Sequence, residues 1–107
     1  MLVQRYDLRA KPGQEERLMD RLEMLGRWLI RHGGCMKVEI LAQTIDTREL
    51  TLLEYWSDNE SRHAAGIAMD RTLLQGIKDS AETIMQCTYR RAYAARNGHA
   101  RDEGYES

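Results

Sequence analysis

The stretch LTLLEYW, Leu50 to Trp56, followed by SDNE, Ser57 to Glu60, decides how the rest of the chain is interpreted. It has the length and the apolar and aromatic content of a β-strand. Successive side chains of a strand point to opposite faces, so one face carries Leu50, Leu52, Glu54 and Trp56. Ser57 with Glu60 three residues later is a capping-box pattern, which predicts that a helix begins at Ser57. The carboxylate beside an indole on this apolar face is the best lead to function.

Composition excludes several classes of protein. The chain has 107 residues, 42% of them hydrophobic, which fits one globular domain. Sixteen basic and seventeen acidic residues give a net charge of -1, and the arginines are scattered, so we expect no nucleic-acid partner. No apolar run is long enough to span a membrane, so we expect no membrane association. The N-terminal residues have no signal-peptide pattern, which leads us to expect a cytoplasmic protein.

The two cysteines, Cys35 and Cys87, are far apart in the sequence. They form no CxxC motif, and no histidine stands at the spacing typical of a zinc site. We therefore expect no metal centre. We also expect both cysteines to be free thiols, because they fall on strands at opposite edges of the sheet proposed below.

Hydrophobic periodicity predicts six elements in the order strand, helix, strand, strand, helix, strand. The turn at Lys11-Pro12-Gly13 separates the first strand from the helix, and Gly33-Gly34 ends that helix. Gly66 is expected to interrupt the second helix. The predicted elements cover residues 2–9, 14–32, 35–44, 50–56, 57–80 and 84–93.

This order is the ferredoxin-like βαββαβ pattern, an α+β fold with helices on one face of a four-stranded antiparallel sheet. The expected spatial order of the strands is 4-1-3-2. Apolar residues also fall on the other face of the sheet, whichever face the helices cover, so we expect a partner subunit there and a homodimer. The domain is assigned to residues 1–95, and residues 96–107 are expected to form a mobile tail because they contain few apolar side chains.

The chain resembles the antibiotic biosynthesis monooxygenase (ABM) family over about residues 2–95. The resemblance rests on the order and spacing of three motifs: the KPGQEE turn from Lys11 to Glu16, the Gly33-Gly34-Cys35 break, and the strand end Glu54-Tyr55-Trp56 with the SDNE segment that follows. It implies a dimeric α/β barrel, in which the sheets of two ferredoxin-like subunits pack together. Family members include cofactor-independent monooxygenases that convert phenols to quinones, haem-degrading enzymes and an isomerase.

The chain departs from the family pattern at two positions. Many members carry a histidine nine residues after the tryptophan, and here that residue is Ala65, with His63 as the nearest histidine. The quinone-forming members carry an asparagine four residues before the tryptophan, and here that residue is Leu52.

Two residues of the central strand are candidates for a site. Glu54 is a candidate general base if its apolar surroundings raise its pKa, and the alternative is a cross-strand or cross-subunit salt bridge to Arg5, Lys37 or an arginine of the last strand. Trp56 is a candidate aromatic wall for a flat ligand, and the alternative is packing between sheet and helix.

Three further side chains are candidates with structural alternatives. His63 is a second catalytic candidate, as a proton shuttle or a haem ligand. The alternative is that it is an exposed helix residue without a role in a site. Tyr6 and Tyr89 would present phenol groups to a substrate, unless they pack in the core.

The favoured function is that of a cofactor-independent monooxygenase acting on a small aromatic substrate of the phenol or quinol type. A base, Glu54 or His63, would remove the phenolic proton, and the electron-rich substrate would react with O₂ in a dry pocket with no cofactor. One alternative is a haem-binding or haem-degrading protein with His63 as ligand. Another is a non-catalytic dimeric domain that binds a small apolar or aromatic ligand.

Overall fold

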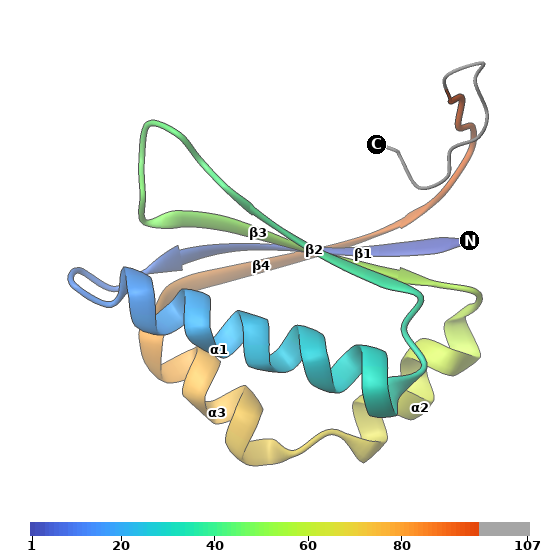
Figure 1. The fold of residues 1–107 in the computed structure, drawn as a ribbon, viewed down its shortest axis with the longest axis horizontal. Helices are drawn as coiled ribbons and strands as arrows, with labels where there is room; N and C mark the ends of the chain where they lie inside the picture. The colour runs from blue at the N-terminus through green and yellow to red at the C-terminus, as the bar shows by residue number, and fades with distance from the viewer. Residues whose placement is uncertain (97–107) are drawn as a thin grey trace.

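The computed structural model describes residues 1–96, which form one sheet covered by helices on one side (Figure 1). The predicted tail at residues 96–107 lies almost entirely outside the described residues. None of the described helices has the length and apolar content needed to cross a membrane. In chain order the elements are β1 (Leu2–Ala10), α1 (Glu15–Trp28), a π-helical turn η1 (Leu29–Gly33), β2 (Lys37–Ala42), β3 (Glu49–Trp56), α2 (Asn59–Ala68), α3 (Arg71–Ser80) and β4 (Ala81–Arg90).

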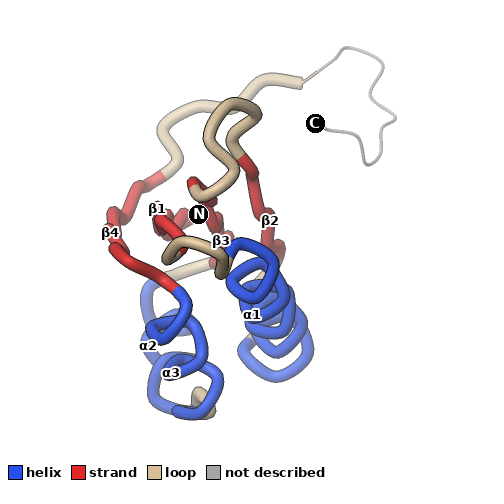
Figure 2. The backbone as a smooth tube through the Cα atoms, turned by 90° about the vertical axis from the view of Figure 1, so that its left-hand side faces the viewer, coloured by secondary structure: helices blue, strands red, loops and turns tan. Residues whose placement is uncertain are grey.

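The four strands form an antiparallel sheet in the order β2-β3-β1-β4, which confirms the predicted topology and the ferredoxin-like fold class. In the register of β1 and β3, Gln4 lies opposite Glu54 and Tyr6 lies opposite Leu52. Seen end-on, all the helices lie on the same side of the sheet (Figure 2). The alternating face predicted for β3 is the one that the helices cover, because Leu50, Leu52, Glu54 and Trp56 are all buried.

The core lies between this sheet face and α1. The sequence spacing of Leu18, Leu22, Leu25 and Leu29, by four, three and four residues, makes a single apolar stripe on the helix, and all four side chains are buried. Gly13 and Gly34 adopt φ angles of 79° and 80° at the start and end of the helical segment. These left-handed conformations suit glycine, which has no Cβ, and they fix both turns that the sequence predicted.

The start of α2 and the break after it differ from the predictions. Asp58, not Ser57, caps α2, since its carboxylate accepts a hydrogen bond of 2.8 Å from the backbone N–H of Ser61. The helix then passes through Gly66 without interruption and ends at Ala68. The break falls at Met69 and Asp70 because the Asp70 carboxylate accepts from the Thr72 N–H at 2.9 Å and so starts α3.

The last strand begins earlier than predicted. Ser80 ends α3, and β4 follows at Ala81 with no intervening loop. The pairing with β1 explains this boundary, since Ala81 already lies opposite Ala10, beyond a shift of register between Arg9 and Ala10. The strand ends at Arg90, so Tyr93 lies outside it.

The other sheet face is open and carries a mixture of apolar and paired polar side chains. Arg5 and Asp7 form an ion pair at 3.1 Å, and the Tyr55 hydroxyl donates to Glu39 at 2.8 Å. The apolar members of this face are Val3, Leu41, Leu53, Met85 and Tyr89, of which Leu41, Met85 and Tyr89 are exposed. A single subunit therefore leaves large apolar side chains of its central sheet in contact with water.

Both cysteines are free, as predicted. Cys35 is buried just before β2, and Cys87 is exposed on β4. These strands form opposite edges of the sheet, which keeps the two thiols apart.

Candidate functional site

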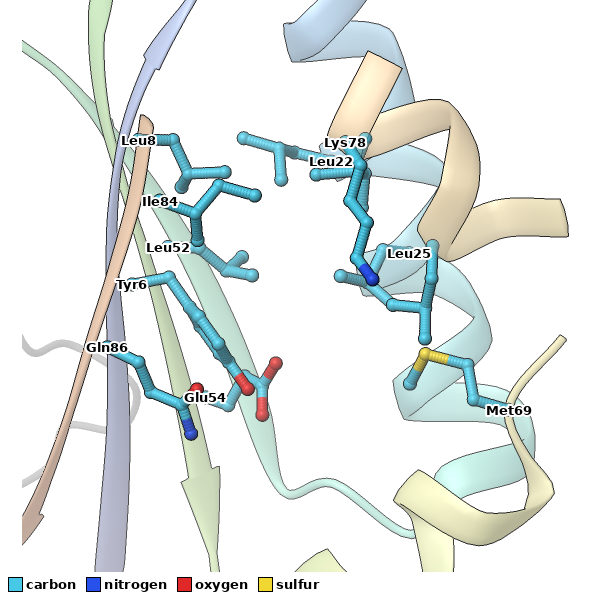
Figure 3. A pocket seen from close by; sticks show the side chains of 12 residues that line it. Tyr6, Leu8, Leu22, Leu25, Leu52, Glu54, Met69, Lys78, Ile84 and Gln86 are labelled. Atoms are coloured by element: carbon cyan, nitrogen blue, oxygen red, sulfur yellow. The ribbon is translucent and has the colours of Figure 1, made fainter. Parts of the chain in front are cut away.

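A cavity of about 210 Å³ lies between the helix-covered face of the sheet and the helices α1 and α3 (Figure 3). Its walls are mainly aliphatic, and polar groups come from only a few side chains. The cavity exceeds the roughly 150 Å³ of an engineered apolar cavity that holds benzene, so it has room for a small aromatic molecule. The lining residues are Tyr6, Leu8, Leu22, Leu25, Leu52, Glu54, Met69, Leu74, Ile77, Lys78, Ile84 and Gln86.

Glu54 is the one acidic side chain among these lining residues, and it is 5% exposed. Its position follows from the alternation of β3, which turns every second side chain toward α1. Its Oε1 accepts a hydrogen bond of 3.1 Å from the Trp56 indole N–H. Burial raises the pKa of Glu54 from 4.5 to about 7, against the opposing effects of the Trp56 hydrogen bond and the Arg62 charge. No salt bridge to Glu54 forms among residues 1–96, so the expected alternative of a cross-strand ion pair is not observed.

Tyr6 lies next to this carboxyl on the neighbouring strand. Figure 3 shows its hydroxyl close to Glu54 at the same end of the cavity. Burial, with a further contribution from the Glu54 charge, raises the pKa of Tyr6 to about 12. The phenol therefore stays protonated at neutral pH, and it can donate a hydrogen bond to an oxygen atom of a ligand.

Gln4 is a second buried polar side chain beside Glu54. It lies opposite Glu54 in β1 and opposite Thr88 in β4, and it is fully buried. The Thr88 hydroxyl donates to Oε1 of Gln4 at 2.7 Å, while Nε2 of Gln4 has no partner in the described part of the chain. Glu54 thus belongs to a polar row that crosses three strands, in which Glu54 and Gln4 are buried and Thr88 is exposed. Gln4 was not a candidate from the sequence, because only the strand register shows that it lies opposite Glu54.

Trp56 does not line the cavity, which corrects the expectation of an aromatic wall. It is 1% exposed and packed in the core. Its indole N–H holds the Glu54 carboxyl, so its contact with the site is indirect. The sequence correctly placed the two side chains on one face. It gave no indication that Glu54 faces the cavity while Trp56 is packed in the core.

The other two candidates lie away from the cavity. His63 is exposed on α2, as its structural alternative anticipated. Tyr89 is 43% exposed and lies opposite Val3 on the open face of the sheet, which the helices do not cover. The structure therefore brings Glu54 and Tyr6 together and separates both from His63 and Tyr89.

Neither position that differs from the family pattern supplies a polar group. Leu52 forms part of the aliphatic wall, and Ala65 is buried where α2 packs against η1. An ideal Cβ at Gly33 would lie 3.4 Å from that of Ala65, so this junction is tightly packed. Among residues 1–96, no group of three His, Cys, Asp or Glu side chains is arranged to hold a metal ion.

Comparison with known proteins points to a single family. The sequence model of the family named antibiotic biosynthesis monooxygenase matches residues 1–65. No curated protein matches the chain.

Solved structures share the fold at low sequence identity. A Nitrosomonas europaea protein assigned as an antibiotic biosynthesis monooxygenase has a TM-score of 0.77 and 22% identity, covering 87% of this chain and 100% of its own. A similarly assigned Deinococcus radiodurans protein has a TM-score of 0.77 and 14% identity, over 91% and 98% of the two chains. A mutant of SnoaB, a cofactor-independent oxygenase of Streptomyces nogalater, has a TM-score of 0.80 and 9% identity, over 90% and 97%.

Proposed function

Since the chain belongs to the antibiotic biosynthesis monooxygenase family, we propose that it oxidises a small phenol or quinol with O₂, without a cofactor, in the cavity that Glu54 lines. The observation that carries this proposal is the carboxyl group itself. It is buried, has no ion-pair partner in the described part of the chain and has a pKa of about 7. A base with a pKa near the working pH combines a useful ionised fraction with useful basicity.

The chemistry assigns one role to each polar group. Glu54 accepts the proton of the substrate hydroxyl, and the Tyr6 hydroxyl donates a hydrogen bond to the oxyanion that forms. The aryloxide ring transfers electrons to O₂, and a ring carbon forms a bond with one oxygen atom. The O–O bond then breaks as that carbon loses its hydrogen, which gives a quinone and water. A phenol and one O₂ thus yield one quinone and one H₂O, with O₂ as the only oxidant.

The shape of the cavity supports this division of roles. Aliphatic side chains exclude water from the reacting ring, and a low dielectric strengthens the electrostatic interactions of Tyr6 and Glu54 with the substrate oxygen. The volume favours a substrate of one or two rings.

The experiment that tests the proposal measures O₂ uptake with 1-naphthol as the probe. We expect the protein to consume one O₂ per molecule of 1,4-naphthoquinone formed, and the product to contain one ¹⁸O atom when the reaction is run under ¹⁸O₂. Binding of 1-naphthol with no O₂ uptake would contradict the proposal and favour a non-catalytic ligand-binding domain. Intact-mass analysis of the purified protein would then identify any retained small molecule.

We further propose that the protein is a homodimer that buries the open face of the sheet. Light scattering after size exclusion is expected to give twice the chain mass at low micromolar concentration. Replacing the half-buried Leu53 of this face with arginine should shift the protein to monomer, because a charge would be placed in an apolar interface. The matched control is Ile67→Arg on α2, where the side chain is 70% exposed and does not belong to the sheet. A stable wild-type monomer would contradict the proposal.

A further inference from the structure

A second charged side chain, Lys78, lines the cavity and has no part in the chemistry proposed above. Leu74 of α3 lines the cavity, and so do Ile77 and Lys78, which follow it by three and four residues. Residues at these spacings share one helix face, so the apolar face of α3 carries the lysine toward the cavity. Figure 3 shows its amine on the helix side of the cavity, across from Tyr6 and Glu54 on the sheet side.

Lys78 has no ion-pair partner among residues 1–96, although acidic residues stand close to it in the sequence. Asp79 accepts a hydrogen bond of 2.9 Å from the Gln75 side chain, and Glu82 pairs with Arg48. The neighbouring carboxylates therefore engage other groups. The ammonium group of Lys78 remains available to a ligand in the cavity.

The position of Lys78 also defines where it would meet a ligand. Lys78 and Gln86 are both exposed while they line the cavity, so they mark the side that opens to solvent. Glu54, at 5% exposure, marks the interior. A ligand that enters past Lys78 thus meets a cation at the opening and a carboxyl group inside.

We propose that the substrate carries an anionic group, such as a carboxylate, which Lys78 binds, on the side of the ring away from the hydroxyl that faces Glu54. This inference rests on the proposed function and adds the substrate class. The opposite orientation is unfavourable because it would place two carboxyl groups together in a buried space. Together, Lys78 and Glu54 select hydroxy-aromatic acids over neutral phenols. They also determine that the hydroxyl group of the substrate, and not its carboxylate, meets the base.

The test compares two probes of similar size, 6-hydroxy-2-naphthoate and its neutral methyl ester, by fluorescence titration at neutral pH and low salt. We expect the wild-type protein to bind the carboxylate about tenfold more tightly than the ester, which corresponds to about 1.4 kcal/mol. Lys78→Met should abolish this preference, and Lys78→Glu should reverse it. The preference in the wild type should decrease as salt is added, because ions screen a charge pair at an opening.

The matched control is Lys11→Met, which removes a lysine that does not line the cavity and should leave the preference unchanged. Lys78→Gln is a second uncharged variant that keeps a polar side chain, so the conclusion does not depend on Lys78→Met alone. Equal binding of both probes, unaffected by Lys78, would overturn the inference and leave the proposed function intact. Failure of both probes and of 1-naphthol to bind would overturn the two together.

Discussion

Glu54→Gln is expected to reduce turnover of a phenolic substrate by about 10²-fold or more, with little change in ligand affinity. Glutamine has nearly the same shape as glutamate, and its carbonyl oxygen can still accept the 3.1 Å hydrogen bond from Trp56. The substitution therefore removes the base and retains the packing. Steady-state O₂ uptake and equilibrium binding, measured on the same preparation, separate the two effects.

The matched control for this substitution is Glu60→Gln on α2, an exposed carboxylate that does not line the cavity. It should leave both turnover and affinity unchanged. Unchanged turnover in Glu54→Gln would show that Glu54 is not the base. A large loss of affinity with little loss of turnover would instead indicate that the carboxyl group only binds the ligand.

Glu54 is also expected to make the protein less stable as the pH rises from about 4.5 to 7. In the unfolded chain the carboxyl ionises with a pKa near 4.5, and in the folded protein the pKa is about 7. Between these values the folded state binds more protons than the unfolded state, so the free energy of unfolding falls as the pH increases. The difference of 2.5 pKa units, 7 minus 4.5, corresponds to about 3 kcal/mol across the window.

Urea unfolding of the wild type and Glu54→Gln at several pH values measures this effect. The glutamine variant should gain about 3 kcal/mol relative to the wild type between pH 4.5 and pH 8, because glutamine does not ionise. Protein concentration must be held constant, since dimerisation would contribute to stability. A pH-independent difference between the two proteins would mean that Glu54 has the same pKa in the folded and unfolded states.

Most of the fold could be predicted from the sequence because it follows from local and repetitive signals. The period of two in β3 groups Leu50, Leu52, Glu54 and Trp56 on one face, and the leucine spacing in α1 is that of a single apolar stripe. Chain order then determined the sheet topology. The errors at Ser57 and Gly66 arose where an aspartate one to four residues away provided the stronger cap, at Asp58 and Asp70.

The site was only partly predictable because it depends on which side chains of one face border empty space. Strand alternation placed Glu54 and Trp56 on one face, yet only the packing of the folded chain shows that Glu54 lines the cavity while Trp56 lies in the core. Tyr89 was misplaced because the alternation of β4 does not reveal which of its faces meets the helices. Lys78 was missed because a lysine beside an apolar stripe is usually a solvated helix residue.

The central claim is that a buried carboxyl group in the cavity titrates near neutral pH and meets the ligand there. Carbon-13 NMR of protein labelled at the glutamate side-chain carboxyl tests it most directly, with the Glu54 signal assigned by its loss in Glu54→Gln. We predict a titration midpoint near 7 for this signal, and a change in its chemical shift when 1-naphthol is added. A midpoint near 4.5, with no response to 1-naphthol, would contradict the account.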